Sequence, residues 1–129
     1  MIKVYLAGQP DMYGGWRDKF SDVLGFEFYN PDTDSNQSSP ETFFPEDLAA
    51  VAAADYLVAY PGTGPAEGTW IEVGYFLALN TDNPGEKCHK LIIIWPPDRL
   101  PKWSIEFVKQ AGHLVETVEE AAELLASIR

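Results

Sequence analysis

The chain has 129 residues and a formal net charge of −11, with 9 Lys and Arg against 20 Asp and Glu. This length suits one domain spanning residues 1–129, and the 46% hydrophobic residues are enough for a buried core. The acidity argues against a nucleic acid or a membrane surface as partner, because both are bound through clustered cations. The one cysteine, Cys88, excludes an internal disulfide, and no targeting or membrane-spanning segment is visible, so we expect a cytoplasmic protein.

The first half of the chain predicts three strands and two helices. Residues 2–7 form an apolar run that stops at a glycine, which indicates a buried strand ending in a turn. The elements expected next are a helix over residues 11–24, a strand over 26–29 and a polar loop over 32–40. Residues 45–54, with Pro45 at their start, predict the second helix, and residues 56–60 predict the third strand.

The second half continues the alternation. A loop rich in glycine and proline over residues 61–65 leads into a helix expected over 69–79. The elements expected after it are a loop over 81–86, a strand over 91–95, a helix over 102–111 and a strand over 114–115. The last helix, over 117–127, opens with a capping box formed by Thr117 and Glu120.

Strict alternation of strands and helices predicts a parallel sheet with helices on both faces. Right-handed crossovers make this a three-layer, doubly wound, flavodoxin-like α/β fold with five strands in the order 2-1-3-4-5. Ligands of such sheets bind beyond the carboxyl ends of the strands, where the strand order reverses. The segments expected at that crevice are residues 8–15, 30–34 and 61–72.

Glu72 is the first candidate for chemistry, because it follows the glycine-rich loop and lies one turn into the next helix. A carboxylate there can project into the crevice as a nucleophile or a general base. A structural interpretation competes with this one. Thr69 and Glu72 have the spacing of a capping box, in which the glutamate only bonds the start of its helix. The loop itself carries neither of the phosphate-binding glycine signatures.

Three further residues allow both a functional and a structural interpretation. Tyr5 is either a core residue of the first strand or a hydroxyl that orients a crevice carboxylate. Asp47 is either an acid favoured by the helix dipole or a group of the crevice. Arg17 is either a solvated surface cation or a contact for a phosphate. The two histidines and the cysteine have no ligand spacing, so we expect neither a metal site nor a Cys-His nucleophile.

Three segments, taken together, resemble a known family. They are Lys3-Val4-Tyr5-Leu6-Ala7-Gly8, then Asp47 followed by Asp55-Tyr56-Leu57-Val58-Ala59, and Gly68-Thr69-Trp70-Ile71-Glu72-Val73-Gly74-Tyr75. The family they resemble is the nucleoside 2-deoxyribosyltransferases, with the related nucleoside 5′-monophosphate N-glycosidases. The third segment is the most specific. The similarity covers about residues 2–80, and the remainder agrees in the order of its strands and helices.

The resemblance implies that Glu72 is the nucleophile, that Tyr5 holds its carboxylate and that Asp47 binds the departing nucleobase. It implies transfer of a 2-deoxyribosyl group from a nucleoside to a free nucleobase through a covalent glycosyl-Glu intermediate, by a homo-oligomer and without cofactor or metal. Substrate contacts are expected at Gly8, Gln9, Trp16, Arg17, Glu67, Gly68 and Thr69. The aromatic residues that are candidates to stack on a base are Tyr13, Trp16 and Trp70.

Two features keep other functions open. Ala66 stands where the transferases carry an aspartate, and Gly14-Gly15-Trp16-Arg17 resembles the glycine-arginine loop of the monophosphate glycosidases. The alternatives are therefore a hydrolase acting on nucleoside 5′-monophosphates, with water as acceptor, and a non-catalytic nucleotide-sensing module. Aromatic residues that are compatible with an oligomer interface are Phe43, Phe44 and Trp103.

Overall fold

A five-stranded parallel sheet is the centre of the computed structural model, which describes residues 1–9, 15–83, 85–99 and 105–128. Its strands are β1 (Ile2–Gly8), β2 (Phe26–Tyr29), β3 (Tyr56–Tyr60), β4 (Leu91–Ile94) and β5 (His113–Val115), in the order β2-β1-β3-β4-β5. β1 pairs in parallel with β2 on one side and β3 on the other, so the strand order reverses at β1. The flavodoxin-like fold and the strand order predicted from the sequence are both confirmed.

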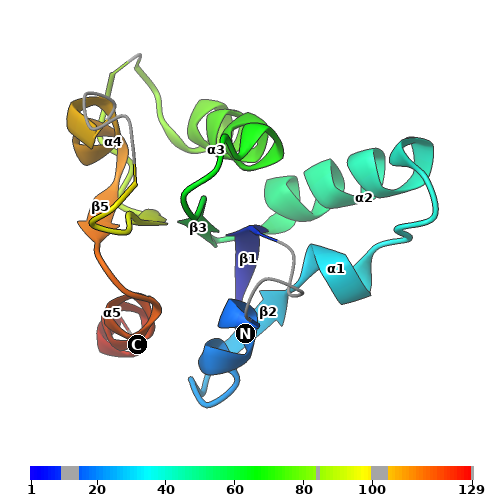
Figure 1. Ribbon diagram of the computed structural model, residues 1–129, viewed down its shortest axis with the longest axis horizontal. Coiled ribbons are helices and arrows are strands. Elements are labelled where there is room, and N and C mark those ends of the chain that lie inside the picture. Colours follow the sequence, from blue (N-terminus) through cyan, green and yellow to red (C-terminus); the bar gives the residue numbers. More distant parts are fainter. Residues whose placement is uncertain (10–14, 84, 100–104, 129) are drawn as a thin grey trace.

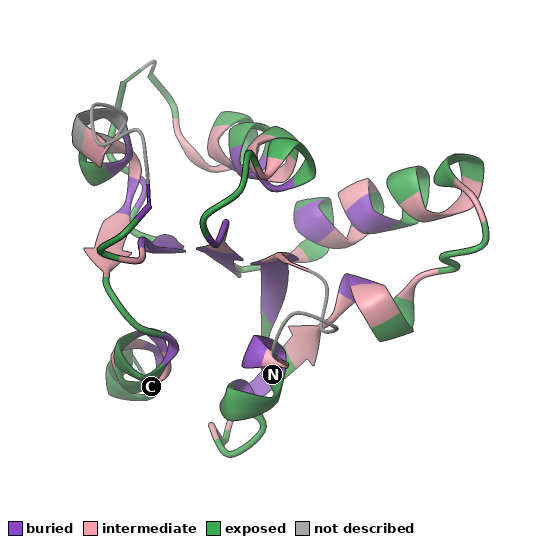
Figure 2. Ribbon diagram, viewed as in Figure 1, coloured by how far each residue is buried: buried purple, intermediate pink, exposed green. Residues whose placement is uncertain are grey.

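Helices cover both faces of the sheet (Figure 1). One face carries α2 (Pro40–Ala53), α3 (Glu67–Asn80) and α4 (Ile105–Ala111), and the other carries the 3-10 helix η2 (Trp16–Phe20) and α5 (Val118–Ile128). Side chains alternate along β1, so that Tyr5 and Ala7 pack under α2 and α3 while Val4 and Leu6 pack against η2 and α5. Burial is deepest in the central strands (Figure 2), where each large apolar side chain stabilises the fold by about 1.5–3 kcal/mol.

The segment between β1 and β2 is not the helix expected over residues 11–24. Residues 10–14 lie outside the described residues, and Trp16–Phe20 form a short 3-10 helix. Ser21 ends this helix, because its amide and its hydroxyl both donate to the Asp18 carbonyl. Trp16 and Phe20 are both buried, so their spacing reflects burial in a short connection rather than an α-helix.

Two expectations around α2 are also wrong. The segment 32–40 is not all loop, because it overlaps a short helix, α1 (Pro31–Asp34), whose Asn30 cap accepts from the Asp32 amide. α2 begins at Pro40 rather than at Pro45, and Pro45 lies inside it. The earlier start is stabilised by Ser39 and Thr42, since the Thr42 hydroxyl accepts from the Ser39 amide.

The remaining helices agree with their predicted positions within a few residues. α3 begins at Glu67, and α4 begins at Ile105, residues 102–104 being outside the described residues. At the start of α5 the Glu120 amide donates to the Thr117 hydroxyl at 3.1 Å, which confirms the predicted cap. Among the described residues, no helix combines the length and the apolar character that a bilayer crossing needs.

Backbone packing is tight at the end of β1, and this gives the first testable expectation. A Cβ added at Gly8 would lie 2.3 Å from the Tyr60 carbonyl oxygen and 2.9 Å from the Trp16 ring. Gly8→Ala is therefore expected to lower the free energy of unfolding by about 1–3 kcal/mol, measured by urea denaturation. Gly74→Ala is the control, since a Cβ there meets open space inside α3 and raises that free energy by about 0.5–1 kcal/mol. Equal effects at the two positions would contradict this account of Gly8.

Candidate active site

A pocket of about 440 Å³ lies beyond the carboxyl ends of β1 and β3, where the strand order reverses. Its wall is made by the end of β1, α1, α2, the loop after β3 and the first turns of α3. The lining residues are Gly8, Gln9, Pro31, Asp32, Gln37, Phe43, Phe44, Asp47, Leu48, Pro61, Gly64, Ala66, Gly68, Thr69, Ile71 and Glu72. The sheet topology therefore places a cavity where a doubly wound fold is expected to bind its ligand.

Glu72 and Tyr5 are in direct contact in this region. Tyr5 is fully buried in β1, and its hydroxyl donates a hydrogen bond to Oε2 of Glu72. The capping-box interpretation of Glu72 is wrong, because α3 begins at Glu67 and has Ala66 as its N-cap, with no side-chain cap. Thr69 is therefore already inside the helix. One carboxylate oxygen of Glu72 is oriented by the sheet instead of by the helix start.

The surroundings of Glu72 weaken its acidity. Burial is the main cause that raises the pKa of Glu72 to about 7, and the charge of Asp47 acts in the same direction. The hydrogen bond from Tyr5 and the charge of Arg17 lower that pKa. Burial, followed by the negative charge of Glu72, raises the pKa of Tyr5 above its ordinary value, so the hydroxyl remains a donor. A carboxylate with a pKa near neutrality is suited to nucleophilic or proton-transfer chemistry.

Asp47 brings a second unusual carboxylate to the pocket. It lies on α2 and is 8% exposed, and its Oδ1 has no hydrogen-bond partner among the described residues. Burial is the main cause that raises the pKa of Asp47, while the Ser35 hydroxyl lowers it. A buried polar atom without a partner destabilises a fold, and at a pocket wall a donor from a ligand would satisfy it.

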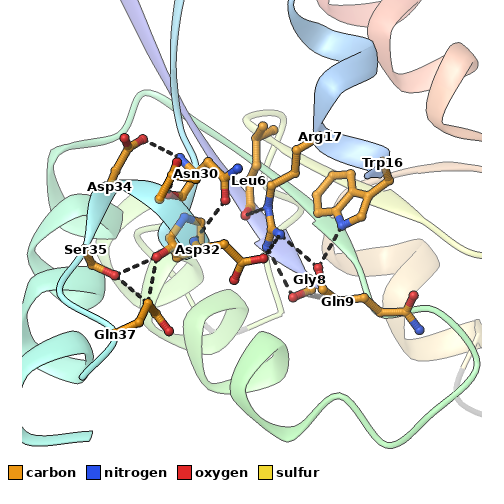
Figure 3. A network of polar contacts seen from close by, with 12 residues as sticks. Leu6, Gly8, Gln9, Trp16, Arg17, Asn30, Asp32, Asp34, Ser35 and Gln37 are labelled. Atoms are coloured by element: carbon orange, nitrogen blue, oxygen red, sulfur yellow. Dashed lines mark hydrogen bonds and ion pairs between the residues drawn. The ribbon is translucent and has the colours of Figure 1, made fainter. Parts of the chain in front are cut away.

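Arg17 donates hydrogen bonds to the backbone carbonyls at the end of β1 (Figure 3). Its Nε donates to the Leu6 carbonyl at 3.1 Å, Nη1 to the Gln9 carbonyl at 2.9 Å, and Nη2 to the Gly8 carbonyl at 3.2 Å. Nη1 also pairs with Asp32 at 3.2 Å. Arg17 is buried and does not line the pocket, so the surface-cation interpretation is wrong. Its visible role is to position the carbonyl ends that border the cavity.

The described tryptophans do not offer a stacking surface to the pocket. Trp16 is buried on the far face of the sheet, and its indole N–H donates to the Gln9 carbonyl at 3.0 Å. Trp70 packs against Trp95, with 6.3 Å between ring centroids. Neither residue lines the pocket, so the expectation that Trp16 or Trp70 stacks on a base is wrong. Tyr13 lies outside the described residues.

The pocket brings together most of the residues that the sequence singled out. Those that line it are Gly8, Gln9, Asp47, Gly68, Thr69 and Glu72, while Tyr5 touches it through Glu72. Glu67 is exposed and lies outside the lining, as do Trp16 and Arg17. Asp32 and Ile71 lie in segments that were expected at the crevice, whereas sequence reasoning missed Gln37 and Leu48 and assigned Phe43 and Phe44 to an oligomer interface instead. Ser39-Pro40, as a helix start, was the signal that could have placed Phe43 and Phe44 on α2.

The pocket is acidic. Three carboxylates line it, from Asp32, Asp47 and Glu72, and its described lining includes no lysine, arginine or histidine. The described residues also contain no group of three or more His, Cys, Asp and Glu that could hold a metal ion. The electrostatic potential of the described lining therefore favours a neutral or cationic ligand that donates hydrogen bonds.

Comparison with known proteins gives likeness in structure rather than in sequence. No family model and no curated protein matches the chain. The CMP N-glycosidase BcmB of Clostridium botulinum is 19% identical with a TM-score of 0.67, over 98% of this chain and 99% of that chain. BlsM is 19% identical with a TM-score of 0.66, over 97% and 87%. A 2-deoxyribosyltransferase of Bacillus psychrosaccharolyticus is 17% identical with a TM-score of 0.66, over 93% and 90%. The chain therefore has the same fold as these three proteins.

The raised pKa of Glu72 predicts a pH-dependent stability. Because the pKa is 4.5 in the unfolded chain and about 7 in the folded protein, the folded state binds this proton more tightly. The stabilising contribution of this group is complete below pH 4.5 and is lost as the pH rises through 7. Glu72→Gln keeps an acceptor for Tyr5 but cannot ionise, so its stability does not fall as the pH rises through 7. Its free energy of unfolding should therefore exceed the wild-type value at pH 8 but not at pH 4.5. Glu123→Gln, at an exposed position of α5, is the control, and an equal gain there would refute the assignment.

Proposed function

We propose that this protein is a nucleoside deoxyribosyltransferase-like enzyme that cleaves an N-glycosidic bond and transfers the 2-deoxyribosyl group to a second nucleobase. The observation that carries the proposal is the hydrogen bond from Tyr5 to Glu72 beside an acidic pocket at the end of β1. The motif resemblance and the shared fold support it. A pocket of about 440 Å³ is also within the range of about 300–1,000 Å³ that is typical of small-molecule sites.

In this proposal Glu72 attacks the anomeric carbon of a bound nucleoside. The bond from that carbon to the base nitrogen breaks, and its electron pair leaves with the base, which takes a proton that Asp47 delivers directly or through a bridging water. The sugar is then held as an ester on Glu72. A second base attacks the same carbon, loses its proton to Asp47 and releases the carboxylate, so the configuration at the carbon is retained. Tyr5 keeps the attacking carboxylate in one orientation.

The charge of the pocket supports an unphosphorylated substrate. Three carboxylates and no described cation surround the cavity, so the dianionic 5′-phosphate of a nucleotide would be repelled there. Arg17, the cation that could have met a phosphate, donates to carbonyls at the end of β1 and to Asp32. Hydrolysis is the second candidate function, supported by the likeness to a CMP N-glycosidase over 99% of that chain. It differs in that the substrate is a nucleoside 5′-monophosphate and that water replaces the second base.

Replacement of the nucleophile is the direct test. Glu72→Gln should fold and should lower turnover by several orders of magnitude, because an amide is a poor nucleophile. Base release or exchange is followed by chromatography on a panel of deoxynucleosides and their monophosphates, with and without a free base. A 2-fluoro-2-deoxy nucleoside should add one sugar mass to Glu72 of the wild type and none to the variant. Full activity in Glu72→Gln, or an adduct on another residue, would end the proposal, and binding without turnover would favour a sensing module.

Tyr5 provides a test through the pH profile. The kcat/KM of the wild type should fall below about pH 7 as Glu72 becomes protonated. Tyr5→Phe removes the hydrogen bond that lowers the pKa of Glu72, so the acid limb of the profile should move to higher pH. Tyr56→Phe, in β3, is the matched control and should leave the limb in place. An unchanged limb in Tyr5→Phe would show that the hydrogen bond does not set the ionisation of the catalytic group.

Self-association, which the resemblance implies, also remains a proposal. α3 exposes Ile71, Tyr75 and Leu79 at four-residue spacing, with exposed fractions of 54%, 38% and 52%. Apart from Glu67, every exposed residue of α3 is uncharged. A second copy of a chain with net charge −11 meets least repulsion at such a face. Phe44 is half-exposed at the pocket, Phe43 is partly buried, and Trp103 lies outside the described residues.

Light scattering tests this surface. We expect a mass above 14.4 kDa for the wild type, and Leu79→Glu should shift it toward 14.4 kDa because a buried carboxylate would oppose the contact. Leu24→Glu is the control, since Leu24 is equally apolar and 73% exposed but lies outside α3. A wild-type mass near 14.4 kDa at every working concentration would contradict the proposal.

A further inference from the structure

The loop between β3 and α3 forms one wall of the pocket and has a backbone that needs support. Pro61, Gly64 and Ala66 line the cavity. Ala66 has φ 56° and ψ 44°, and among the described residues it is the one non-glycine residue with positive φ. The left-handed conformation costs an alanine about 1–2 kcal/mol, so contacts elsewhere must hold the loop in place.

Arg99, which follows β4, supplies such contacts from outside the pocket. It is 5% exposed, and its Nη1 donates to the Gly62 carbonyl at 2.8 Å and to the Gly64 carbonyl at 2.6 Å. Its guanidinium carbon lies 5.0 Å from the centre of the Trp95 ring and 5.6 Å from that of Trp70. One side chain therefore connects the end of β4, the loop and the first turn of α3.

The loop that Arg99 contacts is itself in contact with Gln9 on one side and with the start of α3 on the other. A Cβ on Gly62 would lie 1.8 Å from Nε2 of Gln9, so the Gln9 side chain, which lines the pocket, rests on Gly62. On the other side, the Trp70 amide donates to the Ala66 carbonyl at 3.1 Å. Trp70 precedes Glu72 by two residues on α3. Displacement of Arg99 would therefore move the loop, Gln9 and the start of the helix that carries Glu72.

The charge of Arg99 does not account for its place in the structure. No ion pair is found for it among the described residues, and its Nε has no hydrogen-bond partner there. Arg99 is also absent from the groups that shift the pKa of Glu72, which are Tyr5, Asp47 and Arg17. Its contribution to the site is geometric rather than electrostatic.

We propose that Arg99, whose guanidinium lies against the Trp70 and Trp95 rings, is a positioning residue that clamps the loop 61–66 and thereby fixes the start of α3, which carries Glu72, relative to the rest of the pocket. The hydrogen bond from Tyr5 to Glu72 does not depend on this clamp. The clamp itself is independent of any activity, whereas its effect on turnover rests on the proposed function. Two variants separate the parts of the side chain. Arg99→Met removes both hydrogen bonds to the loop, and Arg99→Lys keeps a charged donor but loses the planar group that lies against the two rings.

The kinetic result distinguishes positioning from charge. Arg99→Met should lower kcat/KM by about 10–100-fold, mainly through kcat, because small displacements of a nucleophile slow the reaction strongly. Arg99→Lys should lie between it and the wild type, and the acid limb of the pH profile should stay near pH 7 in both. Lys19→Met, which breaks an exposed ion pair with Glu119, is the control and should leave kcat/KM unchanged. A shifted acid limb, or wild-type kcat/KM in Arg99→Met, would overturn the proposal.

Amide hydrogen exchange tests the clamp without any substrate. In Arg99→Met the amides of residues 61–72 should exchange faster than in the wild type, while those of β1 and β4 keep their protection. If the Met variant does not fold, the same hydrogen-exchange measurement is made on Arg99→Lys. Unchanged exchange in residues 61–72 would overturn the proposal. If the wild type is inactive on the whole nucleoside panel, the proposed function is refuted. The hydrogen-exchange experiment then still decides whether Arg99 clamps the loop.

Discussion

The position of β1 is the constraint on which the rest of the structure depends. Because β1 pairs with β2 on one side and β3 on the other, the connections after β1 and β3 diverge from its carboxyl end. That divergence opens the pocket. The alternation of side chains along β1 then sends Tyr5 toward α3, where it meets Glu72, and leaves Leu6 on the opposite face. A slip of one residue in this strand would separate Tyr5 from Glu72.

The two buried arginines serve the same edge of the sheet. Arg17 donates to three carbonyls at the end of β1, and Arg99 donates to two carbonyls in the loop after β3. Backbone carbonyls that leave a parallel strand have no ladder partner, and a guanidinium with its planar set of donors can satisfy several of them at once. In a chain with only 9 lysines and arginines, two are thus used to order the backbone around one acidic cavity.

Burial disfavours the ionised form of two acidic groups at the pocket. Burial raises the pKa of both Glu72 and Asp47, and the hydrogen bond from Tyr5 only partly offsets this for Glu72. Asp47 also keeps one oxygen without a partner among the described residues. Such groups lower the stability of the folded state, so their concentration at one cavity is the pattern expected of a functional site.

Sequence patterns were sufficient for the fold class and the strand order, because apolar strand runs and their alternation with helices are local signals. They predicted all five strands, and they singled out Tyr5, Asp47 and Glu72. The role of Glu72 at the helix start could not be decided locally, since Thr69-x-x-Glu72 has the same spacing whether or not α3 begins at Glu67. Arg17 was equally ambiguous and Arg99 was not singled out at all, because only long-range packing shows that their donors meet carbonyls from other segments. Tertiary structure therefore decided which polar side chains face the cavity and which hold its walls, as both depend on contacts between residues far apart in the chain.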